Sequence, residues 1–335
     1  MRIMLLPLLG PLHVRYPAYN AVTLVDLLDW FDPTLTLLTA LAQDALNDPA
    51  WQDTPELALP LAVVPWLRRT GRKHMCIGEP PEDPAAPADF RRYAAPYPTL
   101  QAGFRTADAA RDALIEQLGR PLTPRAVQDS VVPAAADEQA ALLEAFGDGP
   151  ATGWLDERTG QLSDRIVQAA HGTQRLAVLC ELEFAPGLTL RLGGLEGVKM
   201  EPLPDALPAS EAARARSLLD HAFLGEYEAP EALLTGLERL GTAEAGFARA
   251  NVLLATGHAD MALNVLEQVA NGDFSDPYYL PGFVLARLGQ LRDLVGKREL
   301  AKKAYRAVRA LAWAPSEALA AAQDGLENPF TGSAG

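Results

Sequence analysis

Two distant stretches of this 335-residue sequence carry residues that could do chemistry. Gly10-x-x-His13 follows the first apolar run, and Glu181 and Glu183 end the most strand-like run of the chain. A histidine just past a parallel strand lies where such folds bind ligands, and it could bind a metal or act as a base. Glutamates two positions apart face the same side of a strand, where they must be solvated, paired or metal-bound.

Arg165 could complete this site from the helix that precedes the second strand. A guanidinium there could neutralise the carboxylates at the end of the sheet. If the protein is a hydrolase, we expect His13, Glu181 and Glu183 to bind a divalent metal and His13, Glu183 and Arg165 to be catalytic residues; otherwise the sequence indicates no cofactor. Each also has a plain structural interpretation: a polar turn for His13, a solvent-facing edge strand for the glutamates and a surface salt bridge for Arg165.

The elements around these residues predict a parallel sheet. Short apolar runs alternate with segments of helical spacing, and the helix at 20–31 ends at Asp32-Pro33. This order is typical of an α/β domain with a mostly parallel sheet flanked by helices. The predicted strands are 2–9, 34–41, 74–79 and 175–184, followed within 188–203 by a short helix and an edge strand.

The pattern changes after a Pro-rich segment, for which we predict a linker at 204–208 between an α/β domain at 1–203 and a helical domain at 209–330. Only helical spacing follows. The predicted helices are 209–223, 229–240, 243–256, 258–270, 278–295, 297–312 and 315–326.

Two pairs of these helices resemble the tetratricopeptide repeat. Gly257 and Gly296 are each followed by an alanine five positions later and by a large residue nine positions later, Leu266 and Tyr305. The small alanine lets two helices approach, and the large residue fills the next groove. The resemblance implies an array of helical hairpins, a fold that binds other proteins; an ordinary helical bundle is the alternative.

The first domain resembles another family. Its motifs are Gly10-x-x-His13, the Asp32-Pro33 turn, Asp164-Arg165 on a helix and Cys180-x-x-Glu183. This layout over residues 1–203 is similar to the TraB/Tiki and erythromycin esterase-like superfamily, which is related to ChaN-type haem-uptake proteins. The resemblance implies a metal-dependent hydrolase with its site at the C-terminal end of the sheet.

This chain departs from the family pattern at two places. The strand at 34–41 ends in Ala40-Leu41 where the family has an acid, and Cys180 and Glu183 replace a glycine and a histidine. The first change removes a ligand or general base, which Asp44 or Glu56 could replace. Glu183 could still bind a hard metal.

Charge points to the kind of partner. The chain has 29 Lys and Arg against 43 Asp and Glu, so its net charge of −14 makes nucleic acid an unlikely ligand. Residues 287–309 reverse this with eight basic and two acidic residues. This face is either simply solvated or binds an acidic protein. The residues that we assign to partner binding are Arg298, Lys302, Arg306 and Arg309.

Two functions follow from these patterns. The first is a non-catalytic or weakly catalytic scaffold that binds a protein partner through its helical domain, as the missing acid suggests. The alternative is the metal-dependent hydrolase. Because the N-terminal apolar run is interrupted, only two cysteines are present and no apolar stretch is long enough to span a membrane, we expect a cytoplasmic protein with no membrane association.

Overall fold

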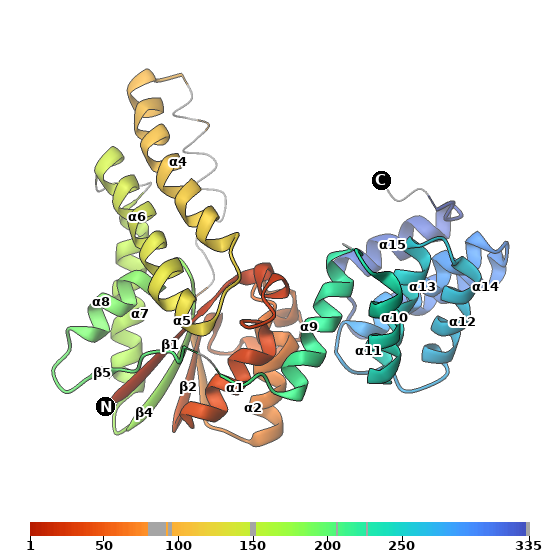
Figure 1. Ribbon diagram of the computed structural model, residues 1–335, viewed down its shortest axis with the longest axis horizontal. Coiled ribbons are helices and arrows are strands. Elements are labelled where there is room, and N and C mark those ends of the chain that lie inside the picture. Colours follow the sequence, from red (N-terminus) through yellow and green to blue (C-terminus); the bar gives the residue numbers. More distant parts are fainter. Residues whose placement is uncertain (80–91, 93–95, 148–151, 206, 226, 333–335) are drawn as a thin grey trace. The chain divides into compact units, whose positions relative to one another are not determined.

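The computed structural model describes residues 1–335 except 80–91, 93–95, 148–151, 206, 226 and 333–335 (Figure 1). The chain divides into two compact units, Met1–Ala213 and Arg214–Gly335. This boundary falls inside helix α9 (Glu211–Leu224), a few residues after the predicted linker.

A parallel sheet forms the centre of the first unit. In the described part of this unit the strand order is β3-β2-β4-β1-β5, and every pairing is parallel. The predicted α/β class is therefore confirmed. The strands are β1 (Arg2–Leu8), β2 (Leu35–Ala42), β3 (His74–Gly78), β4 (Arg175–Glu181) and β5 (Lys199–Met200).

Both faces of this sheet are covered, which explains why its strands read as continuous apolar runs. Along β1, Met4 and Leu6 belong to one core cluster, and Ile3 and Leu5 belong to the cluster on the other side. The first cluster includes residues of α1 (Ala21–Phe31) and α2 (Val64–Thr70). The second includes residues of α7 (Gly153–Ala169) and α8 (Ala185–Gly193).

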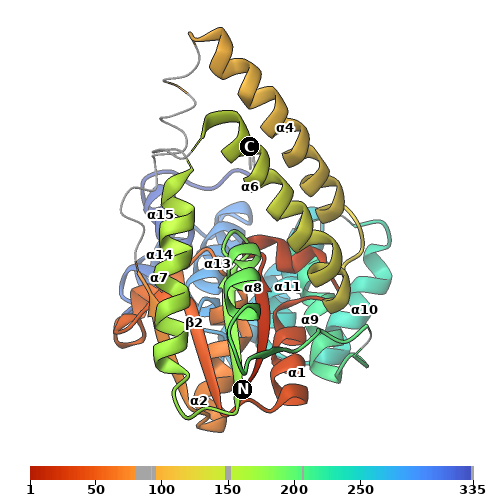
Figure 2. The same cartoon turned by 90° about the vertical axis from the view of Figure 1, so that its left-hand side faces the viewer.

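The other α-helices that the structure describes wholly within the first unit are α4 (Pro98–Leu118), the short α5 (Pro124–Ala126) and α6 (Val132–Phe146). Helices α4 and α6 lie side by side along much of their length (Figure 2). The rings of Phe104 and Phe146 are 4.6 Å apart across this pair.

One side of β1 is only partly paired. β5 pairs with β1 only at Arg2 and Ile3, and Pro7 further along has no N–H to donate. The buried Tyr19 hydroxyl donates to the Pro7 carbonyl oxygen over 2.9 Å, so this buried acceptor is satisfied without a strand.

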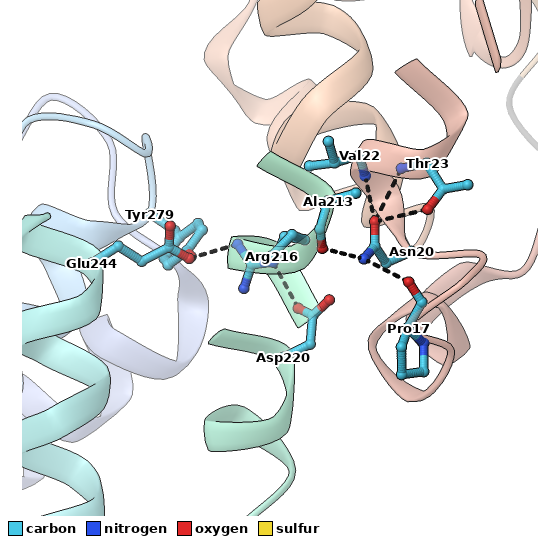
Figure 3. Close-up of polar contacts among 9 residues, drawn as sticks. All are labelled: Pro17, Asn20, Val22, Thr23, Ala213, Arg216, Asp220, Glu244 and Tyr279. Carbon is cyan, nitrogen blue, oxygen red and sulfur yellow. Dashed lines mark hydrogen bonds and ion pairs between the residues drawn. The ribbon is translucent and has the colours of Figure 1, made fainter. Parts of the chain in front are cut away.

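Asn20 caps helix α1 and also holds the start of α9 (Figure 3). Its side-chain oxygen accepts hydrogen bonds from the Val22 and Thr23 amides, both at 3.0 Å. Its side-chain nitrogen donates to the Ala213 carbonyl over 2.9 Å. Because Asn20 is fully buried, this one side chain satisfies donors and acceptors that water does not reach.

The second unit is helical throughout its described residues, as the sequence predicts. Every predicted helix from residue 209 onward is confirmed, with ends shifted by at most three residues. After α9 these helices are α10 (Pro230–Leu240), α11 (Ala243–Ala255), α12 (Ala259–Ala270), α13 (Leu280–Leu294), α14 (Arg298–Arg309) and α15 (Ser316–Glu327).

Tyr305 is the largest fully buried side chain of α14. Its ring lies against Gly289 of α13 and Gly325 of α15, and a Cβ atom at either glycine would overlap the ring. The Tyr305 hydroxyl donates to Asp293 over 3.0 Å. The groove-filling role predicted for Tyr305 therefore depends on two glycines on the neighbouring helices.

A buried charge cluster joins three segments of the second unit (Figure 3). Arg216 of α9 donates from Nε to Asp220 over 2.8 Å and from Nη1 to Glu244 of α11 over 2.6 Å. The Tyr279 hydroxyl, just before α13, also donates to Glu244. A single guanidinium thus serves two carboxylates, and removing it would leave the buried Asp220 and the partly buried Glu244 without a counter-ion.

Candidate functional site

The strand pairing brings the two predicted catalytic stretches to the same edge of the sheet. β1 and β4 are neighbours, with Leu8 opposite Glu181, and the Leu182 amide donates to the Leu8 carbonyl over 3.1 Å. The chain therefore leaves β1 toward His13 beside the point where it leaves β4 toward Glu183. This is the C-terminal end of the strands, where parallel sheets place their ligands.

His13, however, points into the protein. It lies in a short 3₁₀ helix (Gly10–Arg15) and is 1% exposed. Its Nδ1–H donates to the Tyr19 carbonyl over 2.9 Å, and its Nε2 accepts from the Leu9 amide over 3.0 Å. These bonds fix the neutral imidazole, and burial lowers the pKa of His13 to about 4. The ring holds the turn together.

The predicted metal ligands do not fit a divalent cation in this arrangement. A histidine ligand offers the metal a nitrogen lone pair, and that of Nε2 is already used by the Leu9 amide. Among the residues that the structure describes, no group of three or more His, Cys, Asp or Glu side chains could hold a metal ion. We therefore derive no chemistry from a metal here.

Glu56, named from the sequence together with Asp44 as a possible replacement for the missing acid, lies at this edge, although no strand or motif pattern places it there. It is 8% exposed, and its Oε2 accepts a hydrogen bond from the Gly10 amide over 2.9 Å. Burial raises the pKa of Glu56 to about 7, with smaller contributions in the same direction from Glu181 and Glu183; the Gly10 amide opposes the change. A carboxyl group that changes charge near neutral pH can exchange protons with a ligand.

The two predicted glutamates differ in their surroundings. Glu181 ends β4, and its Oε2 accepts a hydrogen bond from the buried Thr39 hydroxyl over 2.5 Å. Glu183 lies beyond the strand and is exposed on one side. Partial desolvation raises the pKa of Glu183, Glu181 adds to this, and Arg158 acts in the opposite direction. Three carboxyl groups therefore share this edge of the sheet.

Arg158, rather than the predicted Arg165, is the arginine whose charge acts on Glu183. Arg165 donates to the Ile77 carbonyl over 3.1 Å and pairs with Glu79, so it binds the end of β3. Arg158 lies two turns earlier on α7, with its guanidinium 5.5 Å from the centre of the Phe184 ring. The spacing of seven residues puts both arginines on one face of α7, which is the signal that could have identified Arg158.

Comparisons with known proteins do not assign the chain to a family. No family model, no curated protein and no solved structure matches the chain. No helix in the described residues has the length and apolar character needed to span a bilayer.

The predicted partner-binding residues on α14 divide into two groups. The face that packs inward is the predicted apolar stripe, Ala301, Ala304, Tyr305 and Val308. Arg298 is also engaged inside the unit: it pairs with Asp293 at 2.9 Å and donates to the Gly325 and Leu326 carbonyls over 2.7 and 3.0 Å. Arg298 is therefore part of the packing between α13, α14 and α15.

The outward face of α14 carries the remaining basic residues. Lys302 is 3.8 Å from Glu299, a loose pair one turn away. Lys303, Arg306 and Arg309 are exposed, and within the described ranges none of them has an ion-pair or hydrogen-bond partner. We call Lys303, Arg306 and Arg309 the α14 basic face. The sequence did not separate Arg298 from these residues, because helical spacing alone does not show which arginine meets a carboxylate.

Proposed function

We propose that this protein is an adaptor that binds an acidic protein partner through its helical unit. The observation that carries the proposal is the α14 basic face: three exposed cations without counter-ions in the described residues, on a chain of net charge −14. Like-charged side chains held on one rigid helix attract a partner of opposite charge and fix its orientation. The repeat-like spacing of α11 to α14 supports a tetratricopeptide-like array as the scaffold.

The hydrogen bonding of His13 at the sheet edge supports the same proposal. The His13 nitrogens are used in structural hydrogen bonds, so the ligand set implied by the TraB/Tiki-like resemblance is incomplete. An α/β unit of this kind would serve as a folded support with little or no chemistry of its own. We also propose, from the motifs of residues 1–203, that this unit is related to the TraB/Tiki-like superfamily.

A charge-reversal experiment tests the adaptor. The full chain, immobilised as bait, would be compared with Arg306→Glu/Arg309→Glu in capture from cells that produce the protein. We expect a partner with an acidic surface to bind the unchanged chain, with affinity that falls as salt rises, and to be lost from the variant.

The matched control reverses two exposed arginines of the first unit, Arg69→Glu/Arg105→Glu, which changes the net charge equally. The control should retain the partner. Equal capture by the unchanged chain and by Arg306→Glu/Arg309→Glu would refute the role of this face, and capture of no specific partner by the unchanged chain would refute the adaptor.

A second candidate function is acid–base hydrolysis at the sheet edge without a metal. Glu56 favours it, because a buried carboxyl group with a pKa of about 7 can donate or accept a proton at neutral pH. The test is ester hydrolysis by the full chain against Glu56→Gln, with Glu196→Gln on the exposed surface as control. Activity that depends on Glu56 and titrates near pH 7 would support this function, and equal rates in all three proteins would reject it.

A further inference from the structure

Among the partly buried arginines that the structure describes in the helical unit, Arg287 lacks the carboxylate partner that the others have. Four partly buried arginines of this unit each pair with a carboxylate: Arg216, Arg249, Arg292 and Arg298. Arg287 on α13 is also partly buried. In the part of the chain that the structure describes, it has neither a hydrogen bond nor an ion pair.

The groups around Arg287 do not neutralise it. Of the titratable residues that the structure describes, Tyr227 and Tyr305 influence it, both uncharged at neutral pH, and burial lowers the pKa of Arg287. The Tyr227 hydroxyl donates to the Ala222 carbonyl over 3.0 Å and the Tyr305 hydroxyl donates to Asp293, so both are engaged elsewhere. A guanidinium that has lost part of its hydration and gained no acceptor is unfavourable unless something else supplies one.

We propose that Arg287 is a binding site for a carboxylate of the acidic partner. The planar guanidinium can bind both oxygens of a carboxylate, and partial burial strengthens such a bond. This inference rests on the proposed adaptor function, but it assigns the contact to α13, separate from the α14 basic face. An aromatic side chain one turn before it on α13, Phe283, is also partly buried.

The site can be tested on the full chain without knowing the partner. Arginine labelled with ¹⁵N gives a side-chain Nε–H signal for each arginine, and the Arg287 signal is assigned by its loss in Arg287→Gln. The probe is the tripeptide acetyl-Glu-Glu-Glu-amide, compared at equal ionic strength with acetyl-Gln-Gln-Gln-amide and with inorganic phosphate.

We expect the glutamate peptide to shift the Arg287 signal saturably, while the glutamine peptide leaves it unchanged. Arg287→Gln should weaken binding of the glutamate peptide by about tenfold or more, since a hydrogen bond to a charged group is worth at least that factor. Arg287→Lys should recover part of the affinity, and Arg306→Gln on the α14 basic face should leave the Arg287 response in place. Thermal melts would confirm that the variants are folded.

Either of two results would overturn the proposal. An unmoved Arg287 signal in the presence of the glutamate peptide would overturn it, whether or not Arg306 responds. A stronger response to phosphate would overturn the assignment to a carboxylate. A saturable Arg287 response combined with failure to capture any partner would instead refute the adaptor and leave the carboxylate site standing, so the two failures are distinguishable.

Discussion

Replacing Glu56 with glutamine should stabilise the first unit at pH 8 and have little effect near pH 4.5. The folded-state pKa of Glu56 is raised to about 7 from the ordinary 4.5, so the folded state holds its proton more tightly than the unfolded chain does. Stability therefore falls as the pH rises from about 4.5 to 7 and stays low above that. Glutamine cannot ionise, and its amide oxygen can still accept the Gly10 hydrogen bond.

The size of the effect follows from the same two pKa values. One pKa unit corresponds to about 1.4 kcal/mol, so the interval from 4.5 to about 7 corresponds to about 3 kcal/mol at pH 8. Because Glu56 is 8% exposed, solvent screening takes little from this value. Rearrangement around the ionised group would reduce the gain, so about 1–3 kcal/mol is the expected range.

Urea unfolding followed by tryptophan fluorescence measures the free energy of unfolding of the first unit. Four of the five tryptophans lie in that unit: Trp30, Trp51, Trp66 and Trp154. The unchanged chain, Glu56→Gln and the exposed control Glu196→Gln would be compared at pH 4.5 and pH 8. The stability gap between Glu56→Gln and the unchanged chain should widen with pH, while the control follows the unchanged chain. A constant gap, or a loss of stability in Glu56→Gln at pH 8, would refute the electrostatic argument.

The other predictions concern packing and buried polar groups. Gly289→Ala should destabilise the helical unit by about 1–3 kcal/mol, because the added methyl overlaps the Tyr305 ring; Tyr305→Leu in the same chain should restore part of the loss in a thermal melt. Arg216→Met should cost about 3–5 kcal/mol at pH 8, measured by urea unfolding, because two carboxylates lose their cation. Asn20→Ala should cost about 1–2 kcal/mol and speed hydrogen exchange in the first turn of α1, whereas unchanged exchange there would refute the capping role.

The fold was predictable because its signals are local. An apolar run closed by Gly10-Pro11 predicts a strand buried on both faces, and Met4 and Ile3 do lie in different core clusters. The helices after residue 209 have apolar residues at a spacing of about 3.6 residues. This spacing can be recognised in the sequence whatever the helix packs against. Tertiary details, such as the close approach of the Tyr305 ring that leaves no room for a Cβ atom at Gly289, depend on the facing helix and cannot be predicted from one helix alone.

The candidate site was less predictable, because its chemistry depends on the direction in which each side chain points. The sequence brings His13 and Glu181 to one edge, but only the fold shows the imidazole turned toward Leu9 and Tyr19. Glu56 joins that edge from a segment with only helix-start signals, and its raised pKa comes from burial, which sequence pattern does not report. Arg165 was expected beside the glutamates and instead pairs with Glu79.

Pro7 and Tyr19 have a consequence for how this protein behaves at high concentration. A strand from another molecule can pair with an unpaired sheet edge, because the amide and carbonyl groups there have no partners. Beyond Ile3, an incoming strand would meet Pro7, which has no amide hydrogen to donate. The Pro7 carbonyl oxygen already accepts a hydrogen bond from the Tyr19 hydroxyl. That stretch is a poor template for aggregation.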